Sequence, residues 1–297
     1  MKEVVVVTDT TACIPAVQVA ANDIEVVPIE LIFGGRAYRD GIDLSPSEFY
    51  ARLRQAKTLP TTAGSLPGPY VSAFQRAGQR ARNILCLTEP ANLSGMYNAA
   101  LVAREMTHAD LPGTRIEVRA GTTGAAGLGL VALAAAREAA QNRGLEEVLR
   151  HTDGVMSRVE LYAALDTLHY LVKGGRVPQA AALVNSLLKI KPIFTLNGGE
   201  AHTVALPRST RSAVQFLLKI MSKRVSPGKA LHVAVMHADA PDIAVVLQKR
   251  IIARFDCAEL FITEFTPVMG VHTGPGLFGI AFYQEDQPSG ATGQNIL

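Results

Sequence analysis

The chain contains no tryptophan and only three cysteines among its 297 residues. Cys13, Cys86 and Cys257 lie far apart in apolar or strand-like stretches, and none has a histidine near it in the sequence. An odd number of scattered thiols predicts reduced cysteines in a cytoplasmic protein rather than a disulfide framework. The same scatter gives little support to a catalytic thiol.

Charge and long apolar runs are also sparse. Charged residues form 19% of the chain, and the net charge of +3 comes from interspersed residues rather than a block of one sign. Nucleic-acid-binding proteins usually carry a basic stripe with aromatic side chains between the charges, so we expect no nucleic-acid partner. No apolar run reaches the roughly 20 residues that span a bilayer, and the four valines after Glu3 are too few for a signal peptide. We therefore expect no stable membrane insertion and a cytoplasmic location.

Motifs for metals and nucleotides are missing as well. The histidines are scattered, and no cluster of Cys, His and Asp has the spacing of metal ligands. His232 and His237 bracket a predicted strand at a spacing that puts them on opposite faces. The glycines of residues 124–129 lack the order of a dinucleotide fingerprint, and no phosphate-binding loop ends in Gly-Lys-Ser or Gly-Lys-Thr. We expect no metal, no cofactor and no nucleotide-dependent kinase activity in this chain.

What is present is a globular pattern, 48% hydrophobic, in a chain long enough for two compact lobes. Strands and helices alternate over residues 1–153, which predicts an N-terminal α/β lobe with a mostly parallel sheet flanked by helices. Strands are expected at Val4–Val7, Val26–Phe33, Ile84–Leu87 and Ile116–Val118, and helices after Pro15, after the capping box Ser45-Pro46-Ser47-Glu48, and at Pro69–Arg82, Ser94–His108 and Gly127–Asn142.

From residue 154 the regular alternation of strands and helices ends, and residues 154–283 are predicted to form a second lobe built as a split α/β layer. A hairpin is expected around Asn197-Gly198-Gly199. The polar tail over residues 284–297, rich in Gly and Ser, is expected to be disordered. The other elements expected here are strands at Glu160–Leu165, Leu231–His237, Glu259–Phe265 and Leu277–Tyr283, and helices at Thr167–Val172, Gln179–Leu188, Thr210–Val225 and Pro241–Phe255.

Residues 92–97, Asn-Leu-Ser-Gly-Met-Tyr, run directly into an apolar helical stretch of small side chains. Ser94 occupies the expected N-cap position, but the third residue after it is Tyr97 rather than Glu or Gln, so no capping box closes. A carboxylate or phosphate of a ligand would fit such a helix start, where N–H groups lack partners. The plainer reading is an ordinary serine cap on an ordinary helix.

Several separated motifs, taken together, resemble one family. They occupy residues 5–10, 27–29, 38–41, 49–50, 60–65, 93–97, 170–176, 188–193 and 272–276. Leu93-Ser94-Gly95-Met96-Tyr97 stands where the family has Leu-Ser-Gly-Thr-Tyr. In order and spacing the motifs are similar to those of the DegV family of bacterial lipid-binding proteins, which includes the fatty-acid-binding subunits of bacterial fatty acid kinase.

The resemblance implies a two-lobe protein that buries the acyl chain of a long-chain fatty acid and holds its carboxylate at the surface of the lobe junction. It implies that the carboxylate of the fatty acid is bound by Thr61, Thr62, Ser94, the Gly95 backbone and His272. Arg176 and Arg208 are expected to lie behind this site or to face a kinase. The ligand would be the bound fatty acid itself, and the partner a separate ATP-dependent fatty acid kinase.

Each of these residues also has a structural alternative. Thr61 and Thr62 follow Pro60 and would suit a cap for the next helix. His272 lies in a predicted loop whose glycines permit close backbone approach to a ligand, yet histidines near such loops are often surface residues. Arg176 would equally suit an ordinary ion pair.

The sequence departs from the family at several positions. Ala63 and Gly64 replace the Gln and Pro of its Thr-Ser-Gln-Pro-Ser loop, Met96 replaces a Thr, and Ala120-Gly121 replaces Asp-Ser. These changes predict a more mobile loop and a pocket that accepts a different chain or lipid.

Two hypotheses of different class follow. The first is a carrier, not an enzyme, that presents a fatty acid to the kinase. The second is a hydrolase of small acyl esters, with Ser94 as nucleophile and His272 as base. The absence of a Gly-x-Ser-x-Gly elbow around Ser94 counts against the hydrolase.

Overall fold

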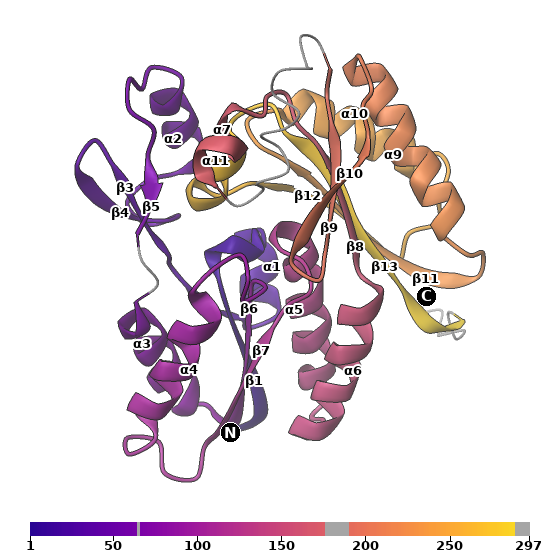
Figure 1. Cartoon of the computed structure of the whole chain (residues 1–297). Coiled ribbons are helices and arrows are strands. Elements are labelled where there is room, and N and C mark those ends of the chain that lie inside the picture. The colour runs from indigo at the N-terminus through magenta and orange to yellow at the C-terminus, as the bar shows by residue number, and fades with distance from the viewer. Residues whose placement is uncertain (64–65, 176–189, 289–297) are drawn as a thin grey trace.

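The structure is a computed structural model that describes residues 1–63, 66–175 and 190–288. Two main sheets lie on either side of a helix pair, α5 (Ala125–Ala140) and α6 (Leu145–Arg158) (Figure 1). This layered α/β arrangement confirms the predicted fold class.

The first sheet is parallel throughout, with strand order β2-β1-β6-β7. Val4–Val7 are buried on both faces of β1, an inner strand, as expected for a parallel sheet covered by helices. The strands are β1 (Lys2–Asp9), β2 (Glu25–Val27), β6 (Ala81–Thr88) and β7 (Arg115–Ala120).

Helices surround this sheet. The N-terminal lobe contains η1 (Thr10–Ala12), α1 (Ala16–Ala21), α3 (Pro67–Gly78) and α4 (Met96–Thr107) besides α5 and α6. Every residue from Ala125 to Ala136 is buried, because α5 contacts β1 of the first sheet and β11 (Lys229–His237) and β13 (Phe278–Pro288) of the second. Its small side chains permit this close packing: a Cβ on Gly129 would lie 2.5 Å from the carbonyl oxygen of Ala12.

A small antiparallel sheet, in the order β4-β3-β5, extends from this lobe. It consists of β3 (Glu30–Phe33), β4 (Arg36–Arg39) and β5 (Thr61–Thr62). The capping box predicted at Ser45 is present: the Ser45 N–H donates to Glu48 Oε2 at 3.1 Å, and helix α2 (Pro46–Leu53) begins there.

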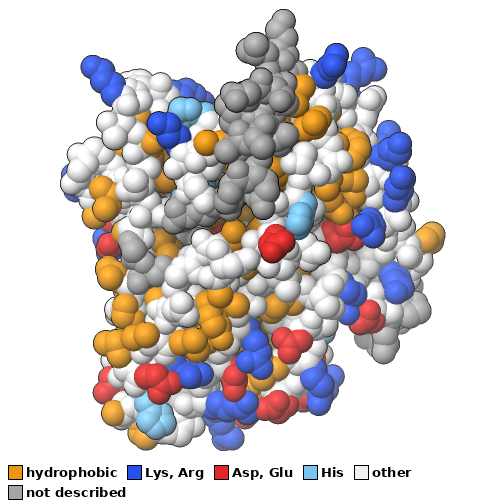
Figure 2. All heavy atoms as spheres, in the orientation of Figure 1, with side chains coloured by type: hydrophobic (Ala, Val, Ile, Leu, Met, Phe, Trp, Pro, Cys, Tyr) orange, Lys and Arg blue, Asp and Glu red, His pale blue; other side chains and the backbone are white. Residues whose placement is uncertain are grey.

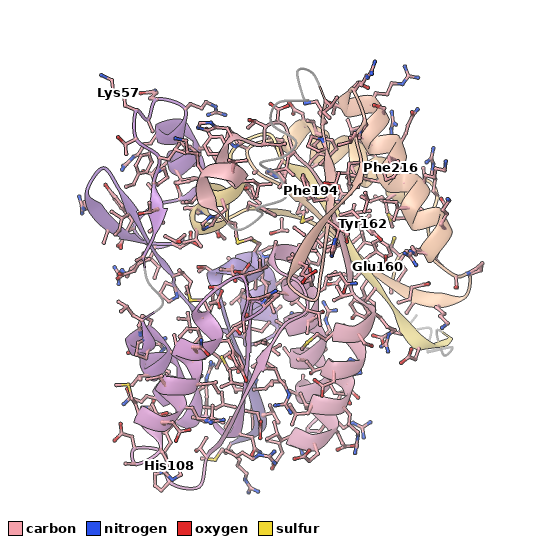
Figure 3. All side chains as sticks on the ribbon, in the orientation of Figure 1. Lys57, His108, Glu160, Tyr162, Phe194 and Phe216 are labelled. Atoms are coloured by element: carbon pink, nitrogen blue, oxygen red, sulfur yellow. The ribbon has the colours of Figure 1, made fainter. Side chains whose placement is uncertain are left out.

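The second main sheet has six strands in the order β10-β9-β8-β13-β11-β12, and only β11 and β12 pair in parallel. The predicted hairpin is confirmed as β9 and β10. The core between this sheet and α9 and α10 includes Tyr162 and Phe216, whereas Phe194 belongs to the core on the α5 side (Figure 3). The elements are β8 (Glu160–Ala164), α7 (His169–Gly174), β9 (Ile193–Asn197), β10 (Glu200–Ala205), α9 (Thr210–Arg224), β11 (Lys229–His237), α10 (Pro241–Ile252), β12 (Glu259–Glu264), α11 (Pro267–Thr273) and β13 (Phe278–Pro288).

Several expectations differ from the structure. The single strand predicted at Val26–Phe33 is wrong, because this segment is divided into β2 and β3, which belong to different sheets; Pro28, which has no N–H to donate to a strand, lies at the division. The start of the disordered tail at Gln284 is wrong, because β13 continues to Pro288 and pairs Gln284 with Leu231. Helix α6 was not expected, and it spans the predicted lobe boundary between residues 153 and 154. His272 lies in helix α11 rather than in a loop. The helix expected at residues 179–188 and the tail from residue 289 lie outside the described residues.

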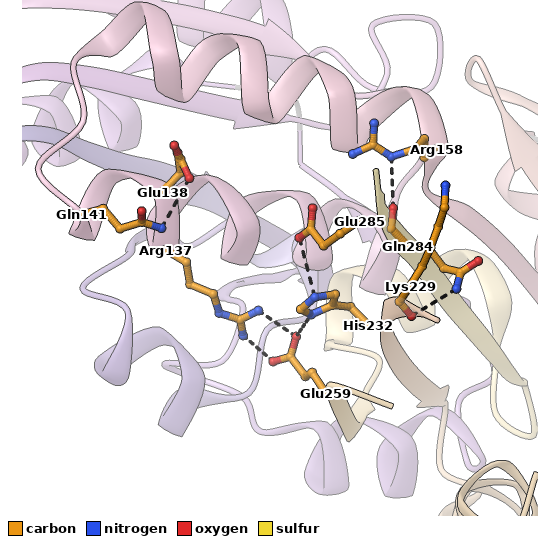
Figure 4. Close-up of polar contacts among 9 residues, drawn as sticks. All are labelled: Arg137, Glu138, Gln141, Arg158, Lys229, His232, Glu259, Gln284 and Glu285. Carbon is orange, nitrogen blue, oxygen red and sulfur yellow. Dashed lines mark hydrogen bonds and ion pairs between the residues drawn. The ribbon is translucent and has the colours of Figure 1, made fainter. Parts of the chain in front are cut away.

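A polar network joins the two lobes (Figure 4). Arg137 of α5 makes a bidentate ion pair with Glu259 of β12, and His232 Nδ1 lies 3.1 Å from Glu259 Oε2. The His232 ring also stacks on the Tyr283 ring, with 4.7 Å between the two ring centroids. Burial opposes ionisation of Glu259, but the hydrogen bonds from His232 and Arg137 prevail and lower its pKa to about 2.

Among the described residues, no helix combines the length and apolar character needed to cross a membrane.

Candidate functional site

A cavity of about 160 Å³ lies where the two lobes meet. Most of the side chains around it are apolar, and they come from both lobes. The lining consists of Thr11, Ile29, Thr62, Glu89, Leu93, Ser94 and Met96 from the N-terminal half and Leu171, Leu196, Val268, Met269, His272 and Thr273 from the C-terminal half.

Three polar residues of this lining come from separate elements. Thr62 is on β5, Ser94 lies just before α4, and His272 is in the last turn of α11. Thr62 Oγ1 lies 3.5 Å from His272 Nε2, so the fold brings together residues 210 positions apart. The structure thus groups three of the side chains singled out from the sequence.

The start of α4 differs by one residue from the expectation. Gly95, not Ser94, is the N-cap residue, and the Ser94 hydroxyl accepts only a long hydrogen bond, 3.4 Å, from the Met96 N–H. The Tyr97 N–H, in the first turn, has no acceptor within the helix. This helix start still offers N–H groups beside Ser94, where an anion is favoured.

A wider hollow of about 650 Å³ lies on the outer side of the same residues. Thr62, Leu93, Ser94 and Met96 line both the hollow and the cavity. Apolar side chains gather on the neighbouring surface over α3 and α4 (Figure 2). A polar group held between Thr62 and Ser94 would therefore lie at the boundary between the interior and this surface.

The structure does not bring all the predicted residues to the cavity. Gly95 lines the outer hollow, and Thr61 lines neither space. Thr61 is exposed because neighbouring residues of a strand point to opposite faces. Arg208 is exposed before α9 and does not line the cavity, and Arg176 lies outside the described residues.

The glycines around His272 serve close packing between protein elements. A Cβ on Gly270 would lie 2.6 Å from Phe49 Cε1, and one on Gly174 would lie 2.7 Å from His272 Nδ1. Gly274 has φ +69°, and a Cβ there would lie 2.0 Å from the Tyr170 ring. These contacts are with neighbouring side chains, and the approach of the backbone to a ligand at these glycines stays a prediction.

Sequence reasoning missed Thr11 and Glu89, which also line the cavity. Both follow the carboxyl ends of adjacent parallel strands, β1 and β6, and this is where ligands bind in such sheets. The buried Asp9 orients Thr11 by accepting from its N–H at 2.9 Å and from its hydroxyl at 2.5 Å. Burial raises the pKa of Asp9, and hydrogen bonds from Thr11 and Tyr70 oppose that rise.

No group of three or more His, Cys, Asp or Glu side chains in residues 1–63, 66–175 and 190–288 is arranged to hold a metal ion. The arrangement offers hydroxyl, imidazole and N–H donors next to an apolar space. This chemistry suits a ligand with one small anionic group and a hydrocarbon part.

Comparison with known proteins shows the family to which this chain belongs. Residues 3–285 match a family described as "Uncharacterised protein, DegV family". A DegV domain-containing protein of Streptomyces coelicolor is 34% identical over 283 residues, which cover 94% of this chain and 98% of that protein. The chain belongs to the DegV family.

Solved structures of DegV proteins have the same fold. A fatty-acid-binding DegV family protein from Thermus thermophilus superposes with a TM-score of 0.88 at 26% identity, covering 96% of this chain and all of that one (100%). DegV from Bacillus subtilis, described as a fatty acid binding protein, gives 0.86 at 25% identity with the same coverage, 96% and 100%.

Proposed function

We propose that this protein binds a long-chain fatty acid, with the carboxylate between Thr62, Ser94 and His272 and the acyl chain in the cavity between the lobes. The observation that carries the proposal is that Thr62, Ser94 and His272, from three separate elements, line one cavity between the lobes whose other lining side chains are mostly apolar. The two bacterial relatives of known structure described above, both named as fatty acid binding, support it.

The apolar lining accounts for affinity. Each methylene removed from water contributes roughly 0.8 kcal/mol, so about 14 methylenes gain on the order of 11 kcal/mol before association costs. The cavity of about 160 Å³ is smaller than the roughly 300–1,000 Å³ of typical ligand pockets. We therefore propose that the cavity widens on binding, and the flexible side chains of Met96 and Met269 in its wall suit that movement.

The polar residues account for the head group. A buried carboxylate costs several kcal/mol unless donors satisfy its oxygens. The hydroxyls of Thr62 and Ser94, an N–H of the His272 ring and the N–H groups at the start of α4 would act as donors without requiring an arginine or lysine among the described lining residues. Thr61 is not part of this set, because its side chain lies on the other face of β5.

We also propose that the protein is a carrier that presents the carboxylate to a separate kinase. Thr62 and Ser94 border the outer hollow, so a carboxylate between them would be within reach from outside. In the kinase reaction, a carboxylate oxygen would attack the γ-phosphorus of ATP, giving an acyl phosphate and ADP. The chain itself lacks a phosphate-binding loop for ATP.

Thr62→Val and Thr61→Val form a matched pair that tests this proposal. Loss of one charged hydrogen bond costs about 1–3 kcal/mol, so Thr62→Val should weaken binding of palmitate by about fivefold or more, whereas Thr61→Val should leave it unchanged. Titration with a fluorescent fatty acid measures both. Equal effects of the two substitutions, or no fatty acid in solvent extracts after incubation with palmitate, would overturn the proposal.

The proposal that the protein presents the bound carboxylate to a kinase is tested with a purified bacterial fatty acid kinase and ATP. The loaded protein should yield acyl phosphate, trapped as a hydroxamate by hydroxylamine, at a rate reduced by Thr62→Val. Product formed equally well from free palmitate without this protein would refute the carrier role while leaving fatty acid binding intact.

A further inference from the structure

A second hollow, of about 580 Å³, lies on the six-stranded sheet where helix α9 ends. Tyr162 and Phe282 contribute to its lining, and both belong to the core between this sheet and α9 and α10. Within the part of the chain that the structure describes, it shares one lining residue, Leu196, with the cavity of the candidate site. This hollow is therefore a separate space, and we call it the basic hollow after the cationic side chains that line it.

Three cationic side chains from separate elements line the basic hollow. Arg158 ends α6, Arg224 ends α9 and Lys229 begins β11. The described lining contains one carboxylate, that of Glu160 on β8, next to Tyr162 (Figure 3). This carboxylate is already engaged, because Tyr162 Oη donates to Glu160 Oε2 at 2.5 Å and Arg224 Nε lies 3.4 Å from the same oxygen. Among residues 1–63, 66–175 and 190–288, no carboxylate lies within ion-pair distance of Lys229.

Hydrogen bonds to Gln284 hold two of these cationic residues in place (Figure 4). Arg158 Nε donates to the Gln284 carbonyl at 3.1 Å, and Asp286, which lies outside the lining, pairs with Nη1 of the same arginine. The Gln284 amide binds both backbone groups of Ser226, at 2.7 and 2.8 Å, and its Nε2 lies 3.4 Å from the Lys229 carbonyl. The fold thus positions these residues before any ligand binds, which lowers the entropic cost of binding.

We propose that the basic hollow is a second binding site, for a phosphate monoester of a small organic molecule. Three cationic side chains against one carboxylate favour a ligand with two negative charges, and a phosphate monoester carries nearly two at pH 7. Guanidinium and ammonium groups are the side chains with which proteins bind phosphate. The inference goes beyond the proposed function, because the ligand and the site both differ from those of the fatty acid.

The size and the lining of the basic hollow indicate the organic part of the ligand. Its volume lies in the range of roughly 300–1,000 Å³ that small-molecule sites occupy, and inorganic phosphate alone would fill little of it. Val159 and Val204 offer apolar contact to an organic group, and Thr195 and Asn197 offer hydrogen bonds. A fatty acid suits this hollow poorly, because its single charge leaves part of the cationic lining unbalanced.

Isothermal titration of the full chain with AMP tests this site, and adenosine, which lacks the phosphate, is the matched control ligand. AMP should bind, and adenosine should bind at least about tenfold more weakly, because it offers no charge to the cationic side chains. Inorganic phosphate should also bind more weakly than AMP, because it has no organic part. Adenosine bound as tightly as AMP, or no binding of AMP at millimolar concentration, would overturn the inference.

Substitutions of exposed side chains place the AMP in the basic hollow. Arg224→Gln and Lys229→Gln should each weaken AMP binding by about fivefold or more, whereas Lys223→Gln, which removes a neighbouring charge outside the lining, should change it less than about twofold. Asp286→Asn should strengthen AMP binding, because it frees Nη1 of Arg158 for the phosphate. Equal effects of Lys229→Gln and Lys223→Gln would overturn the inference. Palmitate binding should be the same in all four variants, since none of these residues lines the cavity, so this failure is separate from a failure of fatty acid binding.

Discussion

Replacing Glu259 by Gln should weaken the link between the lobes in a manner that depends on pH. The side chain of Glu259 is mostly buried, with 12% of it exposed. Its carboxylate forms hydrogen bonds with both terminal nitrogens of Arg137 and with the His232 ring. A fall of its pKa from 4.5 to about 2 corresponds to about 3 kcal/mol of folding free energy, at 1.36 kcal/mol for each pKa unit.

The direction in which this stabilisation changes with pH follows from the lowered pKa of Glu259. Glu259 contributes its full stabilisation above pH 4.5, the value for the unfolded chain, and this contribution is lost as the pH falls toward about 2. At pH 7 the substitution should lower the melting temperature by about 5 °C for a chain of this length. The difference from wild type should shrink steadily below pH 4.5.

Thermal unfolding followed by circular dichroism from pH 7 to pH 3 measures this difference. Glu146→Gln is the matched control, because Glu146 pairs with Arg115 at the surface with 67% of its side chain exposed. An exposed pair contributes about 1 kcal/mol or less, so this control should change the melting temperature little at any pH. A deficit of Glu259→Gln that stays constant from pH 7 to pH 3 would refute the reasoning.

Two other substitutions give clear expectations. Gly270→Ala places a Cβ 2.6 Å from Phe49 Cε1 and 2.7 Å from Tyr50 Oη, so it should lower the free energy of unfolding in urea by about 1–3 kcal/mol and weaken palmitate binding. Gly154→Ala, in the interior of α6, meets only the end of the Arg158 side chain, at 3.4 Å, and should be neutral or slightly stabilising. Equal behaviour of the two variants would contradict the packing argument. Ser94→Ala should weaken palmitate binding and leave any residual hydrolysis of p-nitrophenyl esters unchanged; ester hydrolysis abolished by this substitution would instead support the hydrolase alternative.

Local sequence signals predicted much of the fold. The run of valines predicted the strand β1, and the Ser45 capping box predicted the beginning of α2, because these signals involve neighbouring residues only. Helix α6 was not predicted, because Asp153 and Gly154 in its interior are residues with low helix propensity. In the structure, packing against α5 and β13 stabilises this helix. Around α11, the glycines at positions 270, 274 and 276 suggested a loop for the same reason.

The candidate site was harder to assemble from the sequence. Nothing in local periodicity relates Thr62 to His272, and only the resemblance to a family grouped them with Ser94. The choice between Thr61 and Thr62 depends on the pairing of β5 with β3, since a shift of one residue reverses the faces of a strand.

The most direct test is a crystal structure of the protein loaded with a fatty acid that carries a terminal bromine atom. We expect the carboxylate within hydrogen-bond distance of Thr62 Oγ1 and Ser94 Oγ, and the anomalous signal of bromine inside the apolar space between the lobes. A carboxylate bound elsewhere, for example in the hollow of about 580 Å³ lined by Arg158 and Arg224, or a bromine atom at the surface, would contradict the account.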